Sequence, residues 1–191
     1  RGDYAELEVT TNFSFLRGAS HPDELVYRAV ELGYRAIAIT DFTTLAGVVR
    51  GYEAWKEANS QGIAPRLIIG SRLTFNDFPD LLVWTTDRAS YGRLCRLLTL
   101  GKRRAEKGFC LLNLDDFIAH SEGLLAAIAN RHEHPFRHPA IEMNQPHCQH
   151  TRKRIGELRD LLGDRLSLAI CRLYGDNDPQ QIGAAVELGK S

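Results

Sequence analysis

The stretch between Asn130 and His150 gathers side chains that commonly hold transition metals. It contains His132, His134, His138, His147, Cys148 and His150, within the segments "HEH" and "HCQH". Imidazole and thiolate groups bind Zn²⁺ or Ni²⁺. Their spacings match no zinc-finger signature, so we interpret residues 129–151 as an exposed His- and Pro-rich insertion or loop. An incidental metal site made by these histidines is the alternative, and no resident metal is expected.

A second cluster is basic and lies toward the end of an expected helix. It comprises Arg93, Arg96, Lys102, Arg103, Arg104 and Lys107. Such a group can contact nucleic-acid phosphates. A solvated helix end is the alternative, because basic residues there also interact favourably with the helix dipole.

The elements that must position these residues follow an alternating pattern. Short apolar runs rich in β-branched residues alternate with segments of helical period, which is typical of a parallel sheet built from βαβ units. Strands are expected near 6–10, 35–40, 66–70, 80–86, 123–129 and 165–171. Helices are expected near 22–32, 45–62, 90–100 and 152–162, and a last one up to Ser191, with Ser20 as the first helix cap. The sequence therefore predicts an α/β fold that is cut inside a larger one.

Composition narrows the class of protein. The 191 residues are 43% hydrophobic and carry 24 basic and 24 acidic side chains, so any contact with DNA must be local. No leader or membrane-length apolar run is visible, which predicts a cytoplasmic protein without membrane contact. Four cysteines without a CxxC pair favour reduced thiols, namely Cys95, Cys110, Cys148 and Cys171.

Several segments, in order, carry a family resemblance. "TTNFSFLRGASHP", "RAIAITDFTTLAG", "LIIGSRL" and "YGRLCRLLTLGKRRAEKG" resemble the PHP domain that opens bacterial C-family DNA polymerases, which are DNA polymerase III alpha-like. The resemblance covers roughly residues 3–129 and resumes weakly at "GDRLSLAI". These segments are most similar to the error-prone, lesion-bypass branch of the family, although "ITDFTTLAG" is also similar to replicative enzymes. It implies a distorted (β/α)7 barrel, here partial and without its last strands, so that residues 1–191 form a fragment of the domain.

The resemblance also implies where metal ligands stand in active relatives. The family's His-x-His pair falls on Glu8 and Thr10, and the His after Asp41 falls on Phe42. A carboxylate position is taken by Arg72, which brings a permanent cation instead. The degenerate metal-site positions are thus Glu6, Glu8, Thr10, Asp41, Phe42, Arg72 and Asp80, with Asn130 at a further polar position.

Two readings of these positions stay open besides simple exposure to solvent. On a strand, Glu6, Glu8 and Thr10 share one face, so the acidic residues with Asp41 and Asp80 could form an oxygen-rich Mg²⁺ or Mn²⁺ site. We favour the other reading, in which Arg72 pairs with one or two of these carboxylates and fills the former cavity, since buried charges are paired. Phe42 would then fill the core.

The function implied is that of a non-catalytic PHP domain with a structural and interaction role in an error-prone polymerase. No catalytic residue and no cofactor are expected in this segment. The parent polymerase would copy DNA past lesions by nucleotidyl transfer with Mg²⁺, through residues elsewhere. The alternatives are an active PHP metal-dependent phosphoesterase or 3′–5′ exonuclease, and the replicative rather than the error-prone branch.

The expected partners follow from the same resemblance. They are the remainder of the polymerase chain and, through the parent enzyme, DNA, the sliding clamp and a mutagenesis accessory protein. An open sheet edge would also allow a homodimer of the fragment.

Overall fold

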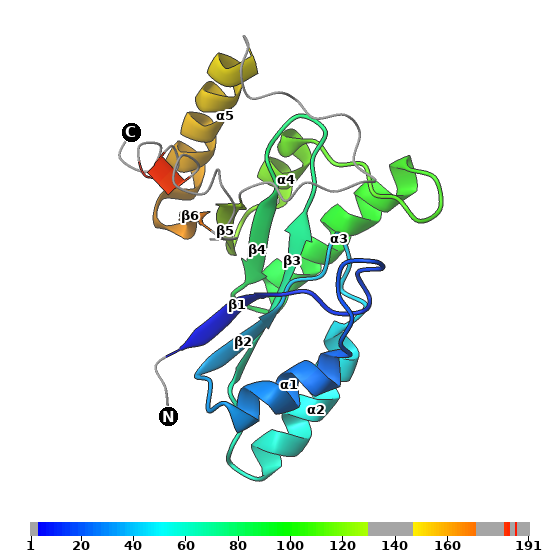
Figure 1. The fold of residues 1–191 in the computed structure, drawn as a ribbon. Helices are drawn as coiled ribbons and strands as arrows, with labels where there is room; N and C mark the ends of the chain where they lie inside the picture. Colours follow the sequence, from blue (N-terminus) through cyan, green and yellow to red (C-terminus); the bar gives the residue numbers. More distant parts are fainter. Residues whose placement is uncertain (1–3, 130–146, 171–181, 184–185, 187–191) are drawn as a thin grey trace.

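A mixed sheet organises the part of the chain that the computed structural model describes, which is residues 4–129, 147–170, 182, 183 and 186. Its six strands lie in chain order, β1 to β6 (Figure 1). The strands are β1 Ala5–Val9, β2 Ala36–Ile39, β3 Arg66–Leu73, β4 Leu81–Thr85, β5 Leu124–Ala129 and β6 Leu166–Ala169. The helices are α1 Pro22–Glu31, α2 Val48–Ser60, α3 Arg88–Arg104, α4 Leu114–His120 and α5 His147–Leu162, followed by a 3₁₀ turn at Gly163–Arg165. The predicted α/β class is confirmed.

The strand directions correct the expectation of a fully parallel sheet. Strands β1, β2 and β3 are parallel, with α1 and α2 as their connections, and β5 and β6 are also parallel. Strand β4 runs antiparallel to both β3 and β5. Only residues 74–80 join β3 to β4, and a parallel crossover needs about a dozen residues or more. This short connection therefore returns the chain as a hairpin.

The two faces of the sheet have different environments. On one face, α3, α4 and α5 pack against β4 and β5 through Leu94, Phe117 and Leu158, which are fully buried. On the other, strands β1, β3, β4, β5 and β6 line a hollow of about 910 Å³, and Leu82 and Trp84 are among its lining residues. The Trp84 indole N–H donates to the Leu7 carbonyl across this hollow, at 2.9 Å. The sheet therefore curls around its own interior, as a partial barrel would.

Element boundaries differ from the expected ones by a few residues, and one helix was missed. Helix α1 is capped at His21 rather than Ser20, and the His21 N–H donates to the Glu24 carboxylate at 2.8 Å. Helix α5 begins earlier than expected, and α4 was not predicted because its 7 residues, about two turns, are too few for a periodic signal. Most of the expected last helix lies outside the described residues.

The described cysteines agree with reduced thiols. Cys95 and Cys110 are free, and burial raises the pKa of the Cys110 thiol. The side chains of Cys148 and Cys171 lie outside the described part of the chain.

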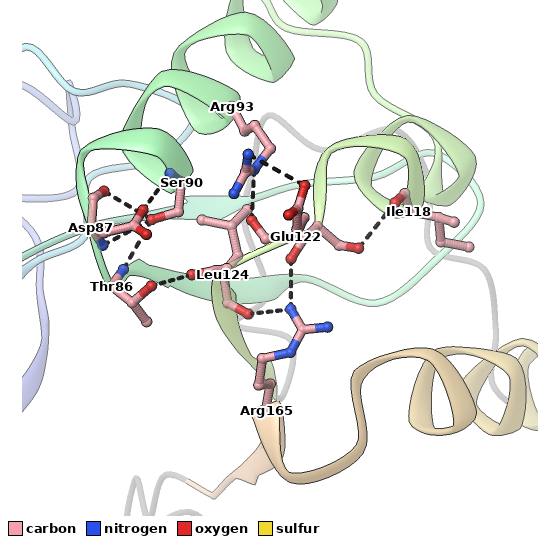
Figure 2. A network of polar contacts seen from close by, with 10 residues as sticks. Thr86, Asp87, Ser90, Arg93, Ile118, Glu122, Leu124 and Arg165 are labelled. Carbon is pink, nitrogen blue, oxygen red and sulfur yellow. Dashed lines mark hydrogen bonds and ion pairs between the residues drawn. The ribbon is translucent and has the colours of Figure 1, made fainter.

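Helix α3 is fixed at its first turn by Asp87. The Asp87 carboxylate accepts a hydrogen bond from the Ser90 backbone N–H at 2.7 Å, and the Ser90 hydroxyl donates to the Asp87 carbonyl at 2.9 Å (Figure 2). This is a side-chain N-cap. It gives a hydrogen-bond acceptor to the Ser90 amide, which has no partner of its own in the first turn of the helix. The cap sets where α3 leaves β4.

Arginines fasten the turn between α4 and β5 to its neighbours. Arg165 donates to the carbonyls of Ser121 and Leu124, at 2.8 and 3.2 Å, and Arg93 donates to the carbonyl of Glu122 at 2.7 Å (Figure 2). Three segments distant in sequence thus meet around one turn through main-chain oxygens. The relative positions of these three segments therefore do not depend on surface ion pairs alone.

Replacing Asp87 with alanine is expected to lower the thermal unfolding midpoint, because the Ser90 amide loses its acceptor. The hydrogen bond from the Ser90 backbone lowers the pKa of Asp87. The stabilisation that the Asp87 carboxylate gives the folded protein is therefore complete above the ordinary Asp pKa of about 3.9. It is lost as the pH falls through the lower pKa that Asp87 has in the folded state. Thermal melting curves recorded between about pH 7 and about pH 2.5 should show that the unfolding midpoints of the wild type and of Asp87→Ala converge at the acid end. Asp160→Ala, at an exposed carboxylate on α5, is the control; an equal loss there would contradict the capping role.

Candidate functional site

Asp41, which follows β2, is a fully buried carboxylate at the centre of the site. One of its oxygens accepts from the Thr11 N–H at 2.8 Å and the Ser14 hydroxyl at 2.6 Å. The other accepts from the Thr11 hydroxyl at 2.8 Å. Both oxygens are thus engaged by donors from the turn that follows β1.

The segment around Asp41 is also tied to β3 through its backbone. The Arg72 N–H donates to the Asp41 carbonyl at 3.0 Å, and the Thr43 N–H donates to the Arg72 carbonyl at 2.9 Å. The Ser71 hydroxyl donates to the same Asp41 carbonyl at 2.8 Å. These bonds extend the parallel pairing of β2 and β3 by one bridge, between Phe42 and Arg72. They hold Arg72 beside the end of β2.

Arg72 is a buried cation with carboxylates from two other elements around it. Its relative exposure is 1%. The guanidinium forms an ion pair with Glu8 of β1, and its Nε lies 3.2 Å from an Asp80 oxygen. Asp80 is itself buried, whereas Glu8 is about a third exposed. The predicted pairing of Arg72 with acidic neighbours is present.

Phe42 covers this cluster without being fully buried. The guanidinium carbon of Arg17 lies 3.6 Å from the ring centroid, and that of Arg72 lies 5.2 Å from it. Both distances are within cation–π range. Phe42 was expected to fill the core, but it is only partly buried and its ring contacts two cations.

Glu6 and Thr10 do not share one face of β1 with Glu8, as the sequence had led us to expect. Glu6 pairs with Ile37 and Val9 pairs with Ile39, so β1 has an extra residue between them. This bulge breaks the two-residue alternation. The Glu6 carboxylate accepts from the Tyr4 hydroxyl at 2.7 Å, and Thr10 lies beyond the end of β1. The expected alignment of Glu6 with Glu8 was therefore wrong.

The residues present do not fit a divalent metal cluster. The Arg72 guanidinium lies among the carboxylates of Glu8 and Asp80 and would oppose a metal ion there. Asp41 already has hydrogen-bond donors on both oxygens. Within residues 4–129 and 150–170, no group of three or more His, Cys, Asp or Glu side chains is arranged to hold a metal.

The His-rich stretch is described only at its end. His132, His134 and His138 lie outside the described residues, and so does the side chain of His147. His150 is exposed on α5. The metal alternative for this stretch stays a prediction.

The basic residues of α3 fall into two groups. Arg93 forms an ion pair with Glu122, with 3.4 Å between the charged atoms, and Arg104 binds Asp116 at 2.5 Å. Partial burial raises the pKa of Asp116, but hydrogen bonds from Arg104 and from the Asn113 backbone outweigh it, so the pKa is lowered overall. The other basic residues of α3, Arg96, Lys102 and Arg103, are exposed, and so is Lys107, which follows the helix.

The residues that sequence reasoning missed are the partners of Asp41 and Phe42. Thr11, Ser14 and Arg17 all lie in the turn after β1. Hydroxyl residues shortly after the first strand were the available signal, since such residues bind nearby polar groups in turns.

The comparison with known families places this architecture in one class. Residues 6–172 match the family model of the PHP domain. The chain belongs to the PHP domain family.

Curated relatives give the particular kind of protein that the chain resembles. It is 45% identical over 189 residues to the error-prone DNA polymerase of Caulobacter vibrioides, which covers 98% of this chain and 16% of that protein. It is 44% identical over 163 residues to the error-prone DNA polymerase of Rhodopirellula baltica, covering 85% of this chain and 13% of the relative. The chain therefore spans about a sixth or less of these polymerases.

Solved structures agree on the fold. A putative metal-dependent phosphoesterase from Bifidobacterium adolescentis superposes with a TM-score of 0.64 and 14% identity, covering 100% of this chain and 84% of that one. An amidohydrolase from Chromobacterium violaceum gives a TM-score of 0.55, also at 14% identity, covering 97% of this chain and 84% of that one. At this identity the likeness shows the fold alone, and it agrees with the predicted partial barrel. No helix in the described residues is long and apolar enough to cross a membrane.

Replacing Arg72 with methionine is expected to destabilise the protein by about 3–5 kcal/mol, because it leaves Glu8 and the buried Asp80 without their counter-charge. The free energy of unfolding in urea measures the effect. Arg28→Met is the control: Arg28 pairs with Glu31 on the surface of α1, and its loss should cost about 1 kcal/mol or less. Equal small losses in both variants would show that the buried pairs contribute little.

Proposed function

We propose that this chain is the PHP domain of an error-prone DNA polymerase and that it contributes structure and contacts rather than phosphoester hydrolysis. The observation that carries the proposal is the buried Arg72, paired with Glu8 and Asp80. Hydrolysis of a phosphoester by metal ions needs ligands that converge on those ions and leave a position for water. A buried guanidinium in that place supplies neither.

The state of Asp41 supports the same proposal. A metal ligand needs lone pairs directed at the ion, whereas hydrogen bonds from Thr11 and Ser14 already occupy three of the roughly four acceptor positions of the Asp41 carboxylate. Gly47 packs so closely that an added Cβ would lie 2.7 Å from an Asp41 oxygen. We assign Asp41 the role of holding the turn after β1 against the end of β2.

The polymerase chemistry would lie in the parts of the relatives that this chain does not cover. There, Mg²⁺ and acidic residues would carry nucleotidyl transfer past damaged bases, with DNA, the clamp and an accessory protein as partners. Any phosphate contact by α3 would fall to Arg96, Lys102 and Arg103, since Arg93 and Arg104 already bind carboxylates.

The decisive measurement is Mn²⁺ binding by calorimetry together with hydrolysis of a phosphodiester such as bis(p-nitrophenyl) phosphate. We expect no saturable Mn²⁺ binding outside residues 130–150 and no hydrolysis above the buffer rate. Deletion of residues 130–150 separates any binding by the His-rich stretch from binding near Asp41.

Asp41→Asn is the matched variant, because an amide oxygen still accepts hydrogen bonds in a side chain of the same size. One equivalent of Mn²⁺ bound by the wild type and lost in Asp41→Asn, with hydrolysis lost in parallel, would overturn the proposal. That result would establish an active phosphoesterase or exonuclease instead.

A further inference from the structure

The turn between β1 and α1 presents large apolar side chains to solvent. Phe15 is 83% exposed and Leu16 is 68% exposed, and Phe13 beside them is also exposed. The turn is the blue loop that follows β1 in Figure 1. Single exposed apolar residues are ordinary, but adjacent large ones at the tip of one turn form a patch that water solvates poorly.

This turn is held firmly in place. Ser14, between the exposed aromatic residues, is buried and donates to Asp41, and its carbonyl accepts from the Arg17 and Gly18 amides at 2.9 and 3.1 Å. A Cβ at Gly18 would lie 2.2 Å from the Thr11 carbonyl oxygen, so the two ends of the turn touch. The exposed side chains are therefore displayed on a fixed backbone rather than on a loose loop.

The backbone at Leu16 is in an unfavourable conformation. Its φ is 60°, in the left-handed region that few residues other than glycine adopt. Such strain persists only when the surroundings impose it, and it gathers at functional and binding positions. At Leu16 the strain directs an apolar side chain into solvent, so burial within residues 4–129 does not explain it.

We propose that Phe15 and Leu16 dock into an apolar pocket in the same polymerase molecule, in the part of its chain outside residues 1–191. The inference rests on the proposed function, in which this domain belongs to a longer polymerase. The curated relatives have about six times the length of the matched region or more, so most of the surface able to cover the turn lies in that remainder. Rigid aromatic and aliphatic anchors that fill pockets supply most of the energy of such contacts.

The test uses the full-length polymerase with a photo-crosslinking benzoylphenylalanine in place of Phe15. We expect irradiation to join position 15 to a peptide from beyond the 191 residues of the same chain, identified by mass spectrometry. The matched control places the same group at Val49, which is also 68% exposed but lies on the regular surface of α2, and should give no such product. A product with a second copy or with another protein, or equal yields at both positions, would overturn the proposal.

A second variant guards against effects on folding. Leu16→Gly removes the side chain and suits the positive φ, so it relieves strain at the turn. Combined with Phe15→Ser, it should speed amide hydrogen exchange about tenfold in the crosslinked peptide, because a central contact is lost. Unchanged exchange there would refute docking. Mn²⁺-dependent hydrolysis by the same polymerase would refute the proposed function alone, because the crosslink does not depend on it.

Discussion

A guanidinium that has lost contact with water has to be neutralised by the protein, and the arrangement around Arg72 follows from that requirement. Desolvation of a charged group costs several kcal/mol unless opposite charges and hydrogen bonds compensate it. Glu8 from β1 and Asp80, directly before β4, provide that compensation. The end of β1 and the start of β4 must therefore both lie beside Arg72 of β3. The curvature of the sheet at this end is tied to one side chain.

Asp41 organises the neighbouring turn through a complementary requirement. Its carboxylate is buried without an arginine or lysine ion pair among those that the structure describes, and it accepts hydrogen bonds from Thr11 and Ser14 instead. Hydrogen bonds from several donors compensate a buried carboxylate for the water it has lost. Arg72 and Asp41 thus have separate sets of side-chain partners, although the backbones of these residues are hydrogen-bonded to each other.

The elements of the fold could be predicted because their signals are local. Strand β2 is a continuous apolar run, and α1 begins with Pro22 and acidic residues, so both are recognisable without knowledge of their neighbours. The family resemblance implied that Arg72 stands among acidic positions, and its pairing followed because buried charges are paired. The bulge in β1 was not, since an extra residue in a strand leaves no mark in a five-residue pattern. Nor was the contact between Arg17 and Phe42, which depends on how a turn folds back in three dimensions.

The hairpin between β3 and β4 bears on how the domain folds. It brings Arg72 and Asp80 together across 8 residues, whereas Glu8 is 64 residues from Arg72. Closing a loop that is three doublings longer costs about 1.8 kcal/mol more in chain entropy. The local pair can therefore form first, while the chain is still largely open, and give Arg72 one counter-charge before β1 arrives with the second. The order in which the buried charge is neutralised would follow the order in which the sheet grows, from its central hairpin toward its edge.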